Sequence, residues 1–168
     1  GSRPVVRAPV ENRIVQRAML DVLQKHDNMG DLLVHEGSFG GIPGHDVRDA
    51  LDHAIRAIRD GRRFYVRSDI KGFFTKIPRA AVVTEVGRRV QDPDFAALLE
   101  EATTTTLANL AQLGPDAGAF PLSEEGVAQG SPLSALLANV SLYEFDRQLN
   151  GRGITCIRYL DDFLILAE

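Results

Sequence analysis

Two adjacent carboxylates, Asp161 and Asp162, interrupt an apolar run at residues 157–166. Successive side chains of a strand point to opposite faces, so two neighbouring aspartates inside a buried strand would place one charge in the core. An unpaired buried carboxylate is strongly destabilising, which predicts a turn between two strands at this point. Carboxylate oxygens at such a turn are the ligands that a hard cation such as Mg²⁺ prefers, because the cation offsets their mutual repulsion.

Two further segments carry residue types that suit the same chemistry. Asp69 ends a β-prone run within residues 65–74, and Gly72 follows where the backbone can approach a ligand closely. Residues 126–139 form a glycine-bounded loop that runs into a helix. An isolated Asp-Asp pair is also typical of an ordinary turn, but these two companions favour a metal-dependent site.

The three segments together resemble the motifs of bacterial reverse transcriptases, the group II intron and retron-like branch in particular. They stand in the family's order, and upstream residues 3–4, 11–16 and 38–44 also look like fingers segments of that branch. Residues 69–74 (DIKGFF) are similar to motif A, residues 129–139 (QGSPLSALLAN) to motif B and residues 159–162 (YLDD) to motif C.

This resemblance implies an RNA-directed DNA polymerase, which extends a DNA primer on an RNA template with deoxynucleoside triphosphates. Joining a 3′-hydroxyl to an α-phosphate needs a deprotonated nucleophile and a neutralised triphosphate, which two divalent ions about 3.5–4 Å apart can supply together. Asp69 and Asp161 are the expected metal ligands, with the Ile70 carbonyl beside them. The resemblance adds Asp162 as the third catalytic carboxylate. The expected cofactor is Mg²⁺, with Mn²⁺ as a substitute.

Residues near Asp69 are expected to contact the incoming nucleotide. Backbone N–H groups of Lys71, Gly72 and Phe73 can meet triphosphate oxygens, because Gly72 has no side chain to obstruct the approach. Phe74 matches the position at which the family excludes a 2′-hydroxyl by steric contact. The alternative is that Phe73 and Phe74 are both core residues, and strand alternation would bury one of the two.

The resemblance assigns further nucleotide contacts to two distant segments. Gln129 and Gly130 match the motif that contacts the sugar and base of the incoming nucleotide. Arg3 matches a fingers residue that grips its phosphates, and Arg7 is a second candidate for the same role.

Tyr159 and Leu160, which precede the paired aspartates, should lie beside the primer end. Leu160 departs from the family pattern, because Ala is commoner at this position in the branch. A larger side chain there should alter fidelity or primer placement.

Helices should position these segments. Apolar spacing and helix-start residues predict helices at residues 11–25, 46–59, 78–90, 92–113 and 131–150, with a break plausible at the β-branched residues 103–106. Few strands with helices packed on one side imply an α+β fold, and the resemblance implies a fingers–palm arrangement with a small antiparallel palm sheet. We expect partial fingers at residues 1–62 and a palm without a thumb at 63–168. The expected inward residues of the first two helices are Ile14, Val15, Ala18, Met19, Val22 and Leu23, and Val47, Leu51, Ala54, Ile55 and Ile58.

The composition bounds these expectations. The 168 residues, 44% of them hydrophobic, can bury a sizeable core. The single Cys156 excludes an intramolecular disulfide, and no apolar run approaches the roughly 20 residues that span a bilayer. A cytoplasmic protein with no membrane partner is therefore expected, and Cys156 should be a packing residue.

The net charge of −4 argues at first sight against nucleic acid, because nucleic-acid-binding proteins usually carry a basic surface. The family's thumb and first fingers hairpin tend to be basic, and neither is present in this sequence. We therefore expect a fragment or a minimal core that binds primer–template weakly and, on its own, polymerises poorly or not at all. An exposed edge on the last strand would favour a homodimer.

Two alternative functions remain at this point. A non-catalytic fold would serve as an RNA-binding maturase or scaffold, although an idle site has no reason to keep three repelling carboxylates. A defence-associated relative would polymerise nucleotides without a template. The comparison of templated extension with untemplated tailing separates the second alternative from reverse transcription.

Overall fold

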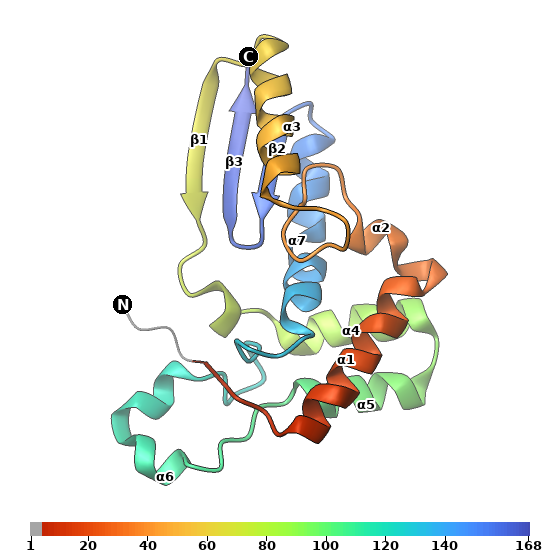
Figure 1. The fold of residues 1–168 in the computed structure, drawn as a ribbon, viewed down its shortest axis with the longest axis vertical. Helices are drawn as coiled ribbons and strands as arrows, with labels where there is room; N and C mark the ends of the chain where they lie inside the picture. Colours follow the sequence, from red (N-terminus) through yellow and green to blue (C-terminus); the bar gives the residue numbers. More distant parts are fainter. Residues whose placement is uncertain (1–4) are drawn as a thin grey trace.

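The computed structural model describes residues 5–168, in which a small sheet stands at one end and a group of helices at the other (Figure 1). The mixture of helices with one antiparallel sheet confirms the predicted α+β class. In chain order the elements are α1 (Val10–Lys25), η1 (Asp27–Met29), α2 (Gly30–Leu33), α3 (Val47–Arg59), β1 (Phe64–Asp69), η2 (Phe73–Thr75), α4 (Arg79–Val90), α5 (Pro93–Thr103), α6 (Leu110–Leu113), η3 (Gly114–Ala119), α7 (Ser134–Asn150), β2 (Thr155–Tyr159) and β3 (Asp162–Ala167).

The sheet has the order β1-β3-β2, and both neighbouring pairs are antiparallel. The hairpin of β2 and β3 is the predicted strand-turn-strand unit, and β1 carries the predicted Asp69 at its end. The expectation of an exposed edge on the last strand is wrong, because β1 pairs with β3 on the side away from β2. The exposed edge strand is β1 instead, whose residues are all exposed.

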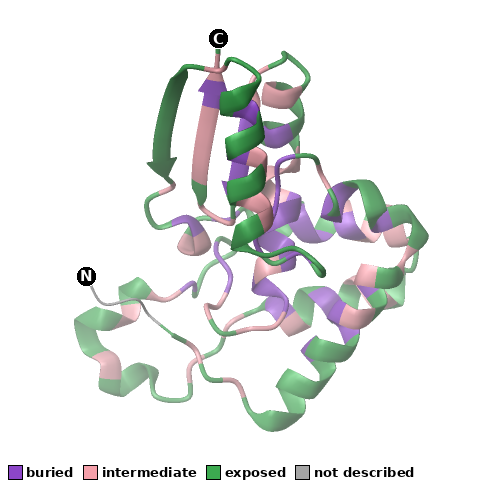
Figure 2. Ribbon diagram, turned by 45° about the horizontal axis from the view of Figure 1, so that its top comes forward, coloured by how far each residue is buried: buried purple, intermediate pink, exposed green. Residues whose placement is uncertain are grey.

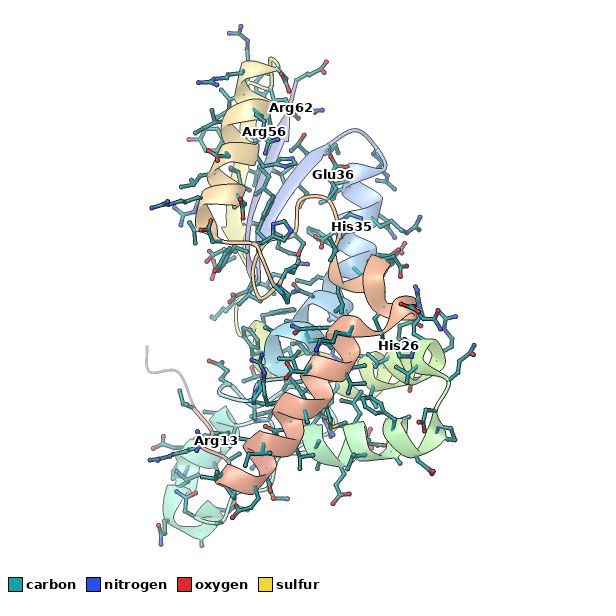
Figure 3. The ribbon with its side chains drawn as sticks, turned by 45° about the vertical axis from the view of Figure 1, so that its right-hand side comes forward. Arg13, His26, His35, Glu36, Arg56 and Arg62 are labelled. Carbon is teal, nitrogen blue, oxygen red and sulfur yellow. The ribbon has the colours of Figure 1, made fainter. Side chains whose placement is uncertain are left out.

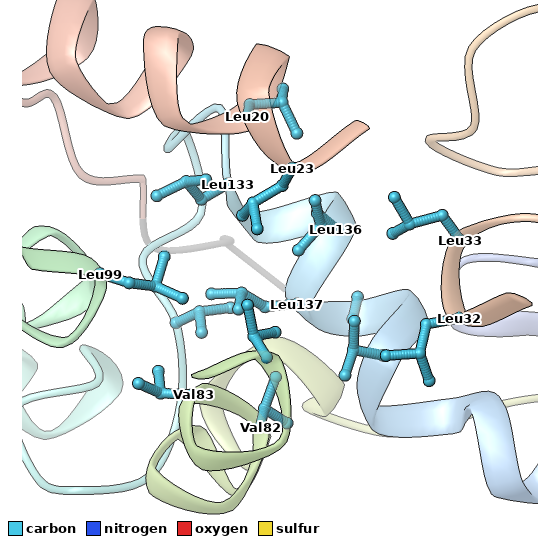
Figure 4. Packing of buried hydrophobic residues seen from close by; sticks show 14 of the residues in the cluster. Leu20, Leu23, Leu32, Leu33, Val82, Val83, Leu99, Leu133, Leu136 and Leu137 are labelled. Carbon is cyan, nitrogen blue, oxygen red and sulfur yellow. The ribbon is translucent and has the colours of Figure 1, made fainter. Parts of the chain in front are cut away.

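A main core lies among α1, α4, α5 and α7, away from the sheet (Figure 4). Leu23 of α1, Val86 of α4, Leu99 of α5 and Leu137 of α7 are essentially inaccessible to solvent in it. Phe73 and Ile77, just after β1, also belong to this core. The segment after Asp69 is therefore anchored among the helices, while Asp69 itself stays at the sheet.

The inward face of α1 is only partly as expected. Met19 and Leu23 are buried as predicted, but Ile14, Val15, Ala18 and Val22 are exposed. The helix buries Gln16 instead, because its amide donates to the carbonyl of Ala102 at 2.9 Å and its oxygen accepts from the Ser131 hydroxyl at 3.2 Å. Two specific hydrogen bonds thus turn a polar residue inward.

The prediction of which α3 residues face the core is largely wrong. Helix α3 starts as predicted, since Asp46 and Asp49 form a reciprocal capping box. It packs on the sheet through its small residues, Ala54 and Ala57, which join Phe39, Ile157 and Leu166 in a second core. The four larger aliphatic residues, Val47, Leu51, Ile55 and Ile58, are exposed instead. Figure 2 shows most of α3 in the exposed colour.

Two further helix boundaries can be compared with the prediction. Helix α5 ends at Thr103, so the break expected at the threonine run is present and only the short α6 follows. Helix α7 begins at Ser134, two residues after the predicted first helical residue Pro132. The predicted capping contact is nevertheless present, because the Ser131 hydroxyl accepts from the Leu133 N–H at 3.2 Å. No helix among residues 5–168 is long and apolar enough to cross a membrane.

Candidate active site

The paired aspartates lie at the tip of the β2–β3 hairpin. Tyr159 and Asp162 are the last paired residues, so Leu160 and Asp161 form a two-residue turn. Leu160 has a φ of 58°, a backbone region that bulky L-residues rarely adopt. Such strained residues persist only where the surrounding structure holds them. The surrounding structure must therefore hold the backbone of Leu160, the residue before Asp161, in this conformation.

Strand β1 brings the third carboxylate to this turn. Asp69 is paired directly with Asp162 across β1 and β3, and the N–H of Ile70 donates to the Asp161 carbonyl at 3.1 Å. Directly opposite residues of an antiparallel pair share one face, with Cβ atoms about 4.5–5.5 Å apart. Asp69 and Asp162 are exposed and Asp161 is half-buried. The fold thus brings Asp69 to the adjacent Asp161 and Asp162, from which it is far apart in the sequence.

The donor set suits a hard cation. In the part of the chain that the structure describes, none of these three carboxylates is in an ion pair with a basic side chain. The carbonyl of Ile70 accepts from the Phe73 N–H at 3.2 Å, and its second lone pair can still bind a ligand. All of these donors are oxygens, as Mg²⁺ and Mn²⁺ prefer.

The side chains do not converge into a formed metal centre. Among residues 5–168, no group of three or more His, Cys, Asp or Glu side chains lies close enough to hold a metal ion. The backbone register brings Asp69, Asp161 and Asp162 together, but their side chains would have to turn towards a common point. The metal ligand set therefore stays a prediction.

The turn after Asp69 is folded around Gly72, whose φ is 65°. Lys71 and Gly72 are exposed, whereas the N–H of Phe73 is already donated to Ile70. The backbone N–H groups of Lys71 and Gly72 are therefore the better candidates for contact with phosphate oxygens. Phe73 is buried in the main core, and half-buried Phe74 packs edge-on against it with ring centroids 5.5 Å apart. Alternation of a core and a more exposed aromatic is as expected, and the role of Phe74 in sugar selection stays a prediction.

The loop that carries Gln129 and Gly130 is attached to the same turn. The N–H of Val127 donates to the Phe74 carbonyl at 2.7 Å, and the N–H of Gly126 donates to the Ile77 carbonyl at 2.7 Å. A side chain at Gly126 would meet the Thr75 carbonyl oxygen at 2.8 Å, so the close approach requires glycine. The turn after Asp69 and the loop at residues 126–130 therefore form one connected unit.

The N-terminal segment crosses this loop. The N–H of Val6 donates to the Gln129 carbonyl at 2.9 Å, and a Cβ on Gly130 would lie 2.6 Å from the Val6 carbonyl oxygen. Arg7, the next residue, is exposed beside it. The structure thus brings Arg7 close to the loop of Gln129 and Gly130, while Arg3 lies outside the described residues.

The two residues expected at the primer end differ in environment. Tyr159 is exposed at the end of β2, where it is paired with Asp162. Leu160 packs partly against the main core, and a Cβ on Gly40 would lie 2.6 Å from the Leu160 N. The Leu160 side chain therefore takes part in packing, which makes Tyr159 the better candidate for contact with a primer.

Basic side chains are spread over the molecule. Figure 3 shows Arg13 of α1 at one end of the molecule. Arg56 of α3 and Arg62, which follows that helix, lie at the other end. Arg62 is partly engaged, since it donates to the Gly153 carbonyl at 2.7 Å. Candidate contacts for nucleic-acid phosphates are therefore present at both ends of the molecule.

Sequence reasoning missed one charged residue beside the site. Arg158 of β2 is 1% exposed and forms an ion pair with the equally buried Asp146 of α7. The only signal in the sequence was a charge between apolar and aromatic neighbours in a strand, at a position that alternation turns inward. The partner of this charge could not be read from the sequence, because Asp146 is on a separate helix.

Comparisons with known proteins place the whole chain in one family. The family model described as "Reverse transcriptase (RNA-dependent DNA polymerase)" matches residues 1–168. The chain is 30% identical to Protein YkfC of Escherichia coli over 161 residues, which are 91% of this chain and 39% of that protein. It is 25% identical to an uncharacterized 91 kDa protein in the cob intron of Schizosaccharomyces pombe over 146 residues, 87% of this chain and 17% of that protein.

Solved structures with a similar fold include two complexes. These are a partial Cas6-RT-Cas1–Cas2 complex and a Cas6-RT-Cas1–Cas2 complex, each with a TM-score of 0.53 and 24% identity. The match covers 97% of this chain in both cases, and 27% and 17% of the respective chains. This chain thus spans less than half the length of each of these relatives.

Proposed function

Because the chain belongs to the reverse transcriptase (RNA-dependent DNA polymerase) family, we propose that it is the catalytic core of an RNA-directed DNA polymerase. The observation that carries this proposal is the register of β1 and β3. It sets Asp69 opposite Asp162 and links Ile70 to Asp161 by a hydrogen bond. Carboxylates from separate segments on rigid strands are what a metal-dependent nucleotidyl transfer requires.

In this proposal Asp69, Asp161 and the Ile70 carbonyl hold divalent cations, Mg²⁺ or Mn²⁺, and Asp162 is the third carboxylate. When bound, two such ions supply an activated 3′-hydroxyl and neutralise the triphosphate. The protein fixes the positions of the carboxylates, because β1 ends at Asp69 at the same edge of the sheet where β3 begins at Asp162. Tyr159, exposed at the adjoining strand end, would contact the primer.

The incoming nucleotide would be held by the connected turn and loop. The N–H groups of Lys71 and Gly72 would donate to triphosphate oxygens, and the Gln129–Gly130 backbone would lie along the sugar and base. Arg7, together with Arg3, would contact the phosphates from the N-terminal segment. Support comes from the hydrogen bonds that tie Val127 to Phe74 and Val6 to Gln129.

The expected division into partial fingers at residues 1–62 and palm at 63–168 is kept as part of this proposal. The proposed substrates are an RNA template, a DNA primer and deoxynucleoside triphosphates. Primer–template affinity should be in the non-specific range, about 10⁻⁴–10⁻⁶ M, because few phosphate contacts are available to a chain of net charge −4.

Templated synthesis is tested by primer extension on poly(rA) with oligo(dT) and dTTP, at low ionic strength so that phosphate contacts are not screened. The account predicts slow incorporation of dTMP that requires both poly(rA) and a divalent cation. Equal incorporation without poly(rA) would favour the template-independent alternative. Primer–template binding without any incorporation, in the chain and in its Asp161→Asn variant alike, would favour the scaffold alternative.

A further inference from the structure

The guanidinium of Arg158 makes every hydrogen bond that its chemistry allows. Its Nε donates to Asp146, its Nη1 to the Asn139 side chain and the Leu160 carbonyl, and its Nη2 to Asp146 and the Ser38 hydroxyl. A guanidinium has five N–H groups, and all five have an acceptor here. The residue therefore sits in a site that matches its planar fork and would not fit a lysine equally well.

These acceptors come from three separate parts of the chain. Asn139 and Asp146 lie on α7, the helix that follows the Gln129–Gly130 loop, and Ser38 lies in the loop between α2 and α3. The fourth acceptor is the carbonyl of Leu160, in the turn that carries Asp161. One side chain thus joins the hairpin tip to two elements that pack around it.

The surrounding backbone reinforces the same junction. The N–H of Arg158 donates to the Gly37 carbonyl, and its own carbonyl accepts from the Phe39 N–H at 2.9 Å. The amide of Asn139 donates to the Gly40 carbonyl at 2.9 Å. The loop at residues 37–40 is therefore fixed both to β2 and to α7, directly beside the turn.

Stability alone does not explain this network. Replacing a buried ion pair by well-packed apolar residues is often neutral or stabilising, because both charges had to be desolvated. What an apolar pair cannot reproduce is the hydrogen bond to the Leu160 carbonyl, in a residue whose φ of 58° is unfavourable without support. The guanidinium thus contributes specifically by stabilising the conformation of the Leu160–Asp161 turn.

We propose that Arg158 is a positioning residue of the reaction, which holds the Leu160–Asp161 turn in the geometry that aligns Asp161 with the end of β1. This rests on the proposed function, in which Asp161 is a metal ligand. Arg158 itself is buried and touches no substrate. Its effect passes through the Leu160 carbonyl to Asp161, whose own carbonyl accepts from the Ile70 N–H.

The test compares two double variants on the intact chain. Arg158→Met with Asp146→Leu removes the buried pair together, so that neither charge is left unpaired. Arg147→Met with Glu144→Leu is the matched control, because it removes an exposed arginine–carboxylate pair from α7, the helix that carries Asp146. Arg158→Lys is made alongside, since it keeps a charge opposite Asp146 but has three donors instead of five.

Two readouts that need no polymerase activity are measured on each folded variant. The first is Mn²⁺ affinity by electron paramagnetic resonance, with Asp161→Asn as the reference for a lost ligand. The second is hydrogen exchange of the Ile70 amide without metal, with the Val127 amide as the internal reference, because its bond to Phe74 lies away from the hairpin.

The proposal predicts Mn²⁺ affinity about 10–100-fold weaker in the buried-pair variant, as for other groups that orient metal ligands, with faster exchange at Ile70 only. Arg158→Lys should also weaken Mn²⁺ binding and speed exchange at Ile70. If the double variant does not fold, the result for Arg158→Lys decides the test. Wild-type affinity and wild-type Ile70 protection in a folded Arg158 variant would overturn the inference. Equal Mn²⁺ binding by wild type and Asp161→Asn would instead overturn the proposed metal site, and Ile70 protection would still report on the role of Arg158.

Discussion

Asp69 and Asp162 lie directly opposite each other in the antiparallel pair of β1 and β3. Like charges at directly opposite positions destabilise a sheet, and neither carboxylate has a basic partner in the region that the structure describes. A bound cation would remove that repulsion. The pair therefore destabilises the metal-free protein locally, and the proposed metal site accounts for its presence.

The first prediction follows from this pair. Asp162→Asn should leave the metal-free chain equally or slightly more stable, by less than about 1 kcal/mol, because one of two like charges is removed at an exposed site. Mg²⁺ should raise the melting temperature of the wild type more than that of the variant. Thermal melts with EDTA and with saturating Mg²⁺ measure both effects.

The control for that experiment is Asp116→Asn, at an exposed position in η3. This variant should keep the full response to Mg²⁺. If Asp162→Asn and Asp116→Asn respond to Mg²⁺ equally, the cation does not bind at the opposed carboxylates.

A second prediction separates Phe74 from Phe73. Phe73→Ala should lose about 3–5 kcal/mol of unfolding free energy, because Phe73 is fully enclosed in the main core. Phe74→Ala should lose less, since Phe74 is half-buried, and should incorporate ribonucleotides more readily relative to deoxynucleotides. Chemical denaturation and a competition between the two sugars measure these effects. Unchanged sugar discrimination in Phe74→Ala would leave Phe74 with a packing role only.

A third prediction concerns Cys156 in β2. Burial, with the nearby charge of Asp146 as the second cause, raises the pKa of the Cys156 thiol from 9.0 to about 11. The folded pKa is therefore above the unfolded one, so this contribution to stability is complete below pH 9.0 and is lost as the pH rises towards 11. The difference in unfolding free energy between wild type and Cys156→Ala should shrink over that interval. A difference that is constant with pH would contradict a buried, protonated thiol.

A fourth prediction addresses self-association. Tyr65 of the exposed edge strand and Leu51 and Ile55 of α3 are large apolar side chains in contact with solvent. Because an unpaired strand edge is a template for pairing with a second chain, Tyr65→Lys should weaken a homodimer. Leu51→Gln with Ile55→Gln should do so only if α3 belongs to the same interface. Sedimentation velocity over a range of concentrations measures this, and a wild type that stays monomeric throughout would contradict it.

The sequence predicted the elements at the site better than their surroundings. The hairpin at residues 155–167 follows from alternation and from the cost of burying Asp161 or Asp162, both of which are local rules. The start of α3 was predictable from Asp46 and Asp49 for the same reason. The sequence paired Asp69 with Asp161, and the family resemblance added Asp162 as the third carboxylate. The observed register then places Asp69 opposite Asp162.

The errors concern relations between distant segments. Periodicity shows that α3 has an aliphatic stripe, but it cannot show that the sheet is approached by the alanine side, where Ala54 and Ala57 allow close contact. It cannot show either that β1 rather than β3 is the edge strand, because strand order depends on tertiary pairing. The buried pair of Arg158 and Asp146 was invisible for the same reason.

In the proposed function Asp161 serves a cation-dependent, templated polymerisation. The decisive measurement is dTMP incorporation on poly(rA)–oligo(dT) at low ionic strength, with wild type, Asp161→Asn and Asp116→Asn compared under the same Mg²⁺ or Mn²⁺ titration. We expect slow, cation-dependent incorporation by wild type and Asp116→Asn, and a loss of several orders of magnitude in Asp161→Asn. Incorporation by Asp161→Asn at the rate of wild type would show that Asp161 has no catalytic role.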